Sequence, residues 1–312
     1  MHIPDGMLDT KTWATAWVGS AGALAYAARR VRQAVDDSRL VLMSVIAALI
    51  FALQMLNFPV AGGTSGHFAG GAAAAILLGP WQALLVMAGV LGVQALFFAD
   101  GGITAFGANV VNMGVVAVFV GWAVYRAASG RSPSPGRRSA AAFAAGWAGC
   151  FVASLFAALE LWISGRAPLL AVVSAMGFWH AVIGIGEGLI TAGLVAYLAQ
   201  TRPGLLDADA PASASSVRPV AVTLGAVALA AAGLSFLASS HPDGLEYVYF
   251  EQGIGRPFAE RVLLHSPMPD YVIPGVANET LAGVLAGAVG VVITGALLYT
   301  AVRALAARRQ AA

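Results

Sequence analysis

The chain carries too little charge for a soluble protein of its size. Only 10% of its 312 residues are charged, whereas soluble domains carry about 25%, and 59% are hydrophobic. The apolar residues come in blocks of about 20, the length that crosses the hydrocarbon core of a bilayer as a helix. Lipid offers the backbone no hydrogen bonds, and the alternating strands of a membrane barrel are absent. The predicted fold class is therefore an all-α integral membrane protein.

Other absences exclude further classes of protein. The single cysteine, Cys150, lies inside an apolar block, which excludes a disulfide framework or a cysteine metal site and predicts a small core residue. No basic run alternates with aromatic residues, so nothing indicates nucleic-acid binding. The first eleven residues lack a basic region, so we expect an uncleaved first helix rather than a signal peptide. No GxxxxGK[ST] phosphate loop is present, so the chain is not expected to hydrolyse ATP by that route.

About nine transmembrane helices are expected from the apolar blocks. They fall at 12–32, 40–57, 61–78, 81–98, 103–125, 139–163, 168–199, 219–238 and 280–302. The third is glycine-rich at its start, where we expect an irregular outer end. It is retained because an even number of crossings must separate the arginine clusters at 29–39 and 126–138 if both lie on the same side.

The basic residues predict the orientation, because cytoplasmic loops accumulate them. With the N-terminus outside and the C-terminus in the cytoplasm, 13 of the 17 basic residues lie inside. The four outside are Lys11, Arg166, Arg256 and Arg261.

The chain divides into two predicted modules. Residues 1–200 form a seven-span module, and 201–218, rich in Pro, Ser, Ala and Asp, form a flexible cytoplasmic linker. Residues 219–312 form a two-span accessory module whose outside segment, 239–279, holds six of the fifteen acidic residues. These acids are Asp243, Glu246, Glu251, Glu260, Asp270 and Glu279.

The first two residues predict a metal chelate. An N-terminal amine gives up its proton readily to a metal ion near neutral pH, and a histidine at position 2 adds an imidazole. The Met1 amine, the His2 amide nitrogen and the His2 imidazole then form fused rings around one ion. Three nitrogens held in this way favour the square-planar geometry diagnostic of Ni²⁺ or Cu²⁺. The simpler alternative is a solvated terminus.

His67 is the predicted fourth ligand. The expected topology places it at the outer membrane face, on the same side as the N-terminus. The sequence Pro4-Asp5-Gly6 predicts a turn that folds the terminus back. Glycines around His67 allow close backbone approach. The alternative is an isolated histidine at the membrane interface.

Polar residues in nearby spans are candidates to orient the two histidines by hydrogen bonds around the ion ligands. The alternative is that they only form hydrogen bonds between helices. They are Gln94, Asp100, Asn109 and Asn112, of which the two asparagines, three positions apart, are expected on one helix face. His180 and Glu187 are intramembrane polar candidates, most simply a structural network. His241 and His265 are expected to be solvated loop residues, with transient metal delivery as the alternative.

Several stretches together resemble the substrate-specific component of energy-coupling-factor transporters for cobalt and nickel, of the CbiM/NikM type. They are MHIPDG at 1–6, NFPVAGGTSGHFAGG at 57–71, LGPW at 78–81, QALFFADGGITAFGANVVNMG at 94–114 and HAVIGIGEGLIT at 180–191. ASSHPDGLE at 238–246 resembles the small CbiN/NikN accessory subunit, here fused to the first module.

The resemblance implies that the transported Ni²⁺ or Co²⁺ is held by the Met1 amine, the His2 amide and imidazole, and His67. It implies a transmembrane coupling subunit and two cytoplasmic ATPases as partners, in a bacterial or archaeal cell membrane. Uptake in this family serves cobalamin synthesis or nickel enzymes, and the chain itself is not an enzyme.

Two other functions are alternatives to this one. A proton-coupled secondary metal transporter would use His180 and Glu187. An intramembrane metalloprotease would need HExxH, which is absent. The choice between nickel and cobalt stays open at this point.

Overall fold

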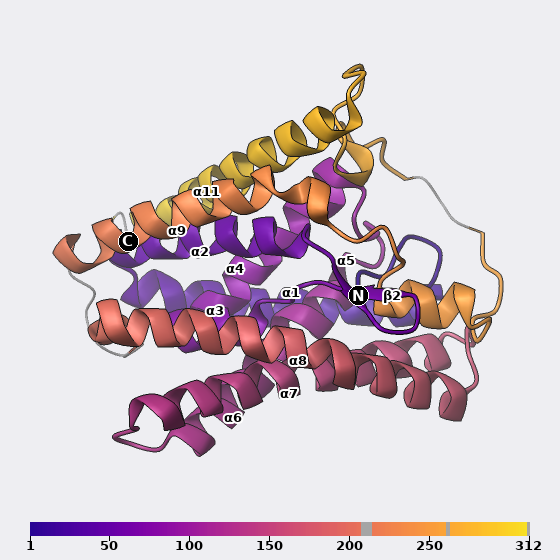
Figure 1. Ribbon diagram of the computed structural model, residues 1–312, viewed down its shortest axis with the longest axis horizontal. Coiled ribbons are helices and arrows are strands. Elements are labelled where there is room, and N and C mark those ends of the chain that lie inside the picture. The colour runs from indigo at the N-terminus through magenta and orange to yellow at the C-terminus, as the bar shows by residue number, and fades with distance from the viewer. Residues whose placement is uncertain (207–213, 260–262, 311–312) are drawn as a thin grey trace.

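The computed structural model describes residues 1–206, 214–259 and 263–310 and shows a bundle of helices with one small hairpin (Figure 1). Its regular elements are α1 (Thr10–Ala34), α2 (Asp37–Gln54), β1 (Phe58–Val60), β2 (Thr64–Gly66), α3 (Gly71–Leu78), α4 (Pro80–Val93), the π-helix η1 (Gln94–Phe98), α5 (Phe106–Asn109), the π-helix η2 (Val110–Val116), α6 (Ala117–Ser129), α7 (Pro135–Ile163), α8 (Leu169–Thr201), η3 (Pro203–Leu206), α9 (Ala214–Gly233), η4 (Ser235–Leu237), α10 (Gly244–Glu246), the π-helix η5 (Tyr247–Glu251), η6 (Pro269–Tyr271) and α11 (Glu279–Gln310).

Six helices among the described residues are long and apolar enough to cross a membrane. They are α2, the continuous helix 80–98, the continuous helix 106–129, α7, α8 and residues 279–307 of α11. Six of the expected spans are therefore confirmed as candidate spans. The expected first span forms α1, which is long enough but rich in Ala, Gly and aromatic residues of low hydropathy. The expected eighth forms α9, whose apolar part, Val217–Gly233, is shorter.

The prediction of a helix over 61–78 is wrong for most of that range. Residues 58–66 form an antiparallel hairpin, and only the eight residues of α3 are helical. Eight residues rise about 12 Å, well short of a bilayer. The end of the irregular part and α3 both contact α2, since Gln54 donates to the carbonyl of Ala69 at 2.7 Å and Arg39 donates to the carbonyl of Leu77 in α3 at 3.4 Å.

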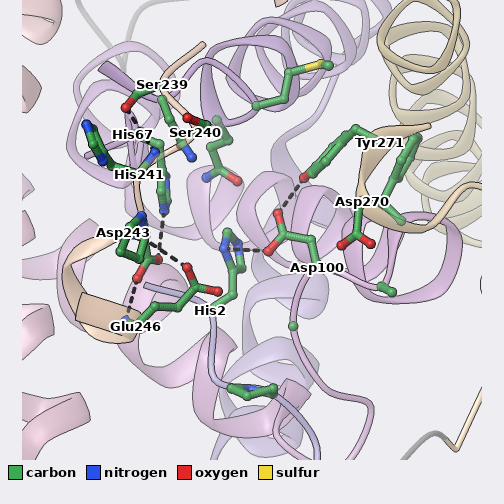
Figure 2. A pocket seen from close by; sticks show the side chains of 18 of the residues that line it. His2, His67, Asp100, Ser239, Ser240, His241, Asp243, Glu246, Asp270 and Tyr271 are labelled. Atoms are coloured by element: carbon green, nitrogen blue, oxygen red, sulfur yellow. Dashed lines mark hydrogen bonds and ion pairs between the residues drawn. The ribbon is translucent and has the colours of Figure 1, made fainter. Parts of the chain in front are cut away.

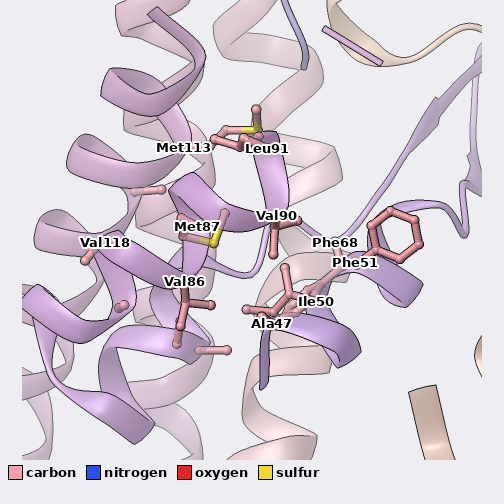
Figure 3. Packing of buried hydrophobic residues seen from close by; sticks show 14 of the residues in the cluster. Ala47, Ile50, Phe51, Phe68, Val86, Met87, Val90, Leu91, Met113 and Val118 are labelled. Atoms are coloured by element: carbon pink, nitrogen blue, oxygen red, sulfur yellow. The ribbon is translucent and has the colours of Figure 1, made fainter. Parts of the chain in front are cut away.

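The helices form two groups joined by a central core. Helices α6, α7 and α8 pack side by side, and α9 and α11 both pack on α2 (Figure 1). Between the groups, α4 contributes Met87 and Val90 to a buried cluster with Ile50 and Phe51 of α2 (Figure 3). Phe68, directly after His67, is buried in the same cluster. The core therefore anchors the chain next to a candidate ligand.

Capping side chains explain where several helices begin. Asp9, Asp36 and Ser134 each accept a hydrogen bond from a backbone N–H in the first turn of the helix that follows.

The linker expected at 201–218 lies partly outside the described residues, at 207–213. Helix α9 already begins at Ala214, within the expected linker.

One end of the bundle collects segments that are far apart in the sequence. The N-terminus, the hairpin, the end of η1 and the segment between α9 and α11 meet there (Figure 1). The bundle thus places the sequence-predicted site residues at one end.

Candidate metal-ion site

The N-terminal residues are folded back into the bundle rather than exposed. Met1 and Ile3 are buried, with Ile3 completely so. The side chain of Asn109 clamps the Ile3 backbone, since its Oδ1 accepts from the Ile3 N–H at 2.9 Å and its Nδ2 donates to the Ile3 carbonyl at 3.1 Å. The N–H of Gly102 donates to the same carbonyl at 2.9 Å. The backbone next to His2 is therefore fixed from two sides.

The turn expected at Pro4-Asp5-Gly6 is present. Gly6 has φ of +88°, a conformation that glycine adopts without a steric cost. The Asp5 carboxylate accepts from the backbone N–H groups of Ile103 and Thr104, at 3.0 and 2.7 Å. Arg166 donates to the Gly6 carbonyl on the other side of the turn, at 3.0 Å. These contacts hold the terminal loop against two inter-helix turns.

The amine of Met1 lies 2.8 Å from Nε2 of His67. The rings of His2 and His67 stack with their centroids 5.3 Å apart and an interplanar angle of 18°. Nitrogens about 2.0–2.1 Å from a common ion, at right angles to each other, lie about 2.9 Å apart. The observed separation therefore suits two neighbouring ligands of a single ion.

His2 is oriented by residues from the chain that follows α4. Its Nδ1 lies 3.0 Å from Oδ1 of Asp100, and its Nε2 lies 3.2 Å from Oε1 of Gln94. The hydroxyl of Tyr271 donates to Oδ2 of Asp100, and Nε2 of Gln94 donates to the same hydroxyl at 3.2 Å. Gln94 and Asp100 thus contact His2, as expected for residues that surround the ligands.

Asp243 of the accessory segment is the functional candidate that sequence reasoning missed. Its carboxylate forms an ion pair with the Met1 amine. The same carboxylate lies 3.9 Å from Nε2 of His67, and Figure 2 shows these two side chains next to each other. The available signal was the PDGLE motif in an acid-rich segment on the same predicted side as the N-terminus. Spacing alone could not identify this contact, because 242 positions separate its partners.

Burial and charge shape the protonation of the site. The pKa of His67 is lowered to about 3, because burial and, after it, the neighbouring positive amine lower it more than the carboxylates of Asp243 and Asp100 raise it. For each of these aspartates burial raises the pKa, but nearby positive groups outweigh it, so that both pKa values lie well below the usual range. His2 is the main opposing charge at Asp100, and the amine is at Asp243. The His67 imidazole is therefore neutral and able to bind a metal.

The loop that carries His67 is fixed by α8 and α2. Glu187 accepts from the backbone N–H groups of Ala69 and Gly70, at 2.6 and 3.0 Å. Gln54 holds the Ala69 carbonyl from the opposite side. The expected structural network at Glu187 thus has specific partners.

Two other sequence candidates do not join the histidines. Asn112 donates instead to Oε2 of Glu160 at 2.7 Å. The expectation that Asn109 and Asn112 share a face is not met, because η2 begins at Val110 and its wider turns change the angle between them. His180 contacts the Met176 carbonyl through Nδ1 at 2.9 Å, within α8.

A cavity of about 660 Å³ leads to the two histidines. Four carboxylates line it, and none of the described residues in its lining is a Lys or Arg (Figure 2). They belong to Asp100, Asp243, Glu246 and Asp270. His241 is exposed and also lines the cavity, whereas His265 is exposed and does not. No cluster of three or more His, Cys, Asp or Glu side chains fit to hold a metal occurs within the described ranges.

Comparisons with known proteins agree with this architecture. A family model described as "Cobalt uptake substrate-specific transmembrane region" matches residues 2–205, and the PDGLE domain matches 218–307. A chain of Archaeoglobus fulgidus is 43% identical over 97% of this chain and 98% of its own length. The fused nickel transport protein NikMN of Rhodobacter capsulatus is 36% identical over 99% of both chains. A crystal structure of a truncated transition metal transporter superposes with a TM-score of 0.58, at 33% identity, over 64% of this chain and 99% of its own.

By these findings the chain is a multi-pass membrane protein with the fold of transition metal transporters. The chain belongs to the family of cobalt-uptake substrate-specific transmembrane components, of the energy-coupling-factor type, and carries a PDGLE domain fused to it. It is a non-catalytic component of cobalt or nickel uptake in bacterial or archaeal membranes.

Proposed function

We propose that the chain captures one Ni²⁺ or Co²⁺ ion with the Met1 amine, the His2 amide and imidazole nitrogens, and the His67 imidazole. The observation that carries this proposal is the 2.8 Å separation of the amine and Nε2 of His67 at the base of an acid-lined cavity. Four nitrogens in one plane suit nickel well. Nickel is also the ion named for the full-length relative of Rhodobacter capsulatus, which supports nickel as the principal substrate.

Ion binding requires a local change at His2. The ring nitrogens of His2 contact Asp100 and Gln94, so the ring must turn toward the ion to complete the chelate. After that turn, Asp100 and Gln94 remain near the ligand shell. The Ile3 backbone can stay clamped by Asn109 throughout, so the movement is confined to the first two residues.

The cavity end of the bundle faces the outside in this proposal, and the C-terminus faces the cytoplasm. The distribution of basic residues supports this orientation. The four carboxylates that line the cavity attract a divalent ion toward the site. Residues 1–200 act as the ion-binding module, 201–218 as a linker and 219–312 as the accessory module. A transmembrane coupling subunit and two cytoplasmic ATPases supply the energy for inward release.

Binding of nickel by purified variants tests the proposal. His2→Ala, and separately one glycine inserted before Met1, should each abolish high-affinity Ni²⁺ and Co²⁺ binding measured by calorimetry in lipid nanodiscs. His265→Ala is the matched control, because it removes an exposed histidine outside the cavity and should bind as wild type. Wild-type affinity in either N-terminal variant would refute the chelate.

A further inference from the structure

We propose that Asp243 competes with the ion for the N-terminal amine and thereby promotes release of the ion. The inference rests on the function proposed above and concerns the regulation of the same site. One carboxylate oxygen, Oδ2, contacts the Met1 amine and lies 3.9 Å from Nε2 of His67. The same oxygen thus faces both nitrogens that the ion would bind.

The carboxylate is positioned by its own segment. Oδ1 of Asp243 accepts from the backbone N–H groups of Leu245 and Glu246, at 2.8 and 2.9 Å, as the N-cap of α10. Oδ1 is therefore committed to the helix start, and Oδ2 is left for the amine. Because the first oxygen is held by two bonds, the second has a defined direction toward Met1.

The accessory segment is in turn fixed on the loop that carries His67. The N–H of Ser65 donates to the Pro242 carbonyl at 2.8 Å, and its hydroxyl donates to the His241 carbonyl at 2.8 Å. Gly244 packs so closely on α8 that a Cβ there would lie 2.7 Å from Ile183. Asp243 and His67 are thus parts of one rigid contact, joined by a parallel bridge at Ser65.

The accessory module also acts on His2, the second residue of the proposed chelate, through Asp100. Tyr271 donates to Asp100, whose other carboxylate oxygen contacts Nδ1 of His2. The Met1 amine and the His2 imidazole, which the first residues would offer to an ion, are therefore both paired with carboxylates. Asp243 belongs to the accessory module, and Asp100 is oriented by it.

Competition follows from these contacts. The free amine and Asp243 make a charge-assisted contact in a largely buried place. The ammonium must release a proton to solvent before its nitrogen can bind the ion, and the neutral amine then makes a weaker contact with Asp243 than the ammonium does. A contact that favours the ion-free state lowers the apparent affinity and speeds release. The accessory module would thus help to discharge the ion.

Dissociation of Ni²⁺ from the purified full chain in nanodiscs tests this role. Asp243→Asn keeps an oxygen for the α10 N–H groups and removes the charge that holds the amine. We expect its apparent Kd for Ni²⁺ to be about tenfold lower and its release into excess chelator to be slower. Glu251→Gln is the control, because it removes a charge from an exposed residue of the same module outside the cavity, and both values should stay as in wild type.

Weaker binding by Asp243→Asn would overturn the inference, since it would make Asp243 a ligand of the ion. Unchanged affinity and release would overturn it as well. Asp243→Ser provides a second variant if the first folds poorly, because serine also caps helices but carries no charge. Failure of the proposed function is distinguishable, since His2→Ala would then bind normally, whereas failure of this inference alone leaves His2→Ala unable to bind.

Discussion

The Met1 amine nitrogen and Nε2 of His67 lie 2.8 Å apart, although 66 positions separate them in the sequence. The hairpin and the clamped terminal loop bring these two nitrogens together. Because the two nitrogens are already close, little backbone movement is needed to place an ion between them. Such a preformed arrangement lowers the ordering cost of binding.

We expect nickel to stabilise the folded chain through His67. At a free Ni²⁺ concentration about 100 times the Kd, the free energy of unfolding should rise by about 2.7 kcal/mol. His67→Gln should remove this rise, because the amide offers no imidazole nitrogen to the ion. Thermal unfolding in detergent with and without Ni²⁺ measures it. His265→Ala should keep the full rise, and an equal rise in His67→Gln would exclude His67 as a ligand.

Variants of Asn109 and Asn112 distinguish a role in the ion site from a role in helix packing. Asn109→Ala loses both bonds to the Ile3 backbone and should weaken Ni²⁺ binding by about 10- to 100-fold, as is usual for groups that orient ligands. Asn112→Ala loses a bond to Glu160 and should lower stability while it leaves the Kd unchanged. Calorimetric titration of both variants makes the comparison. Equal losses of affinity would show that general loosening of η2 is responsible.

The sequence was sufficient to predict the helical membrane class and the pairing of the first residues with His67. The helices follow from apolar length, and the closeness of the first residues to His67 follows from the expected topology, which put both on one side. The chelate itself stays a prediction. The irregular chain at 61–70 was anticipated only as an irregular end, because the bonds that satisfy its backbone come from Gln54 and Glu187 on other helices. Such partners are set by tertiary packing rather than by local pattern.

The same limit explains the two errors at the site. The divergence of Asn109 and Asn112 depends on a π-helix, and nothing in the local sequence marked its position. The contact of Asp243 with the amine depends on how the accessory segment docks on the hairpin. The charge pattern placed that segment on the same predicted side as the N-terminus. It could not select Asp243 among the six acidic residues of the segment.

The contribution of Asp9 to stability at the start of α1 should depend on pH. Its carboxylate accepts from the Thr12 N–H at 3.0 Å and from the Ser164 hydroxyl at 3.2 Å. Contacts with Thr12, first with its side chain and then with its backbone N–H, are the main cause that lowers the pKa of Asp9 below its usual 3.8. A lowered folded-state pKa contributes stability above the unfolded value, and this contribution is lost as the pH falls through the folded value.

Asp9→Ala should therefore lower the free energy of unfolding by about 1 kcal/mol near pH 7, the usual effect of removing an N-cap. The difference between variant and wild type should shrink as the pH falls below about 4, where the unfolded carboxyl gains its proton. Denaturant unfolding at pH 7 and at pH 3 measures both values. A difference that stays constant with pH would show that the charged form of Asp9 does not matter.

Glu187 should act on ion binding through the backbone after His67. Its two oxygens accept from the N–H groups of Ala69 and Gly70 inside the bundle, where no other acceptor replaces them. Leaving a buried N–H group without a partner costs about 1–3 kcal/mol. Glu187→Ala should therefore displace the His67 loop and weaken Ni²⁺ binding strongly, while Glu187→Gln, which keeps one oxygen, should weaken it by about tenfold.

Thr191 offers the matched control, because it lies one turn further along α8, is buried, and its hydroxyl has no hydrogen-bond partner in the described chain. Thr191→Val should bind Ni²⁺ as wild type does. The order of affinities expected from calorimetry is wild type and Thr191→Val, then Glu187→Gln, then Glu187→Ala. A graded loss indicates a positioning role, because each lost acceptor releases part of the loop. Wild-type binding by Glu187→Ala would show that the hairpin and Gln54 hold His67 without it.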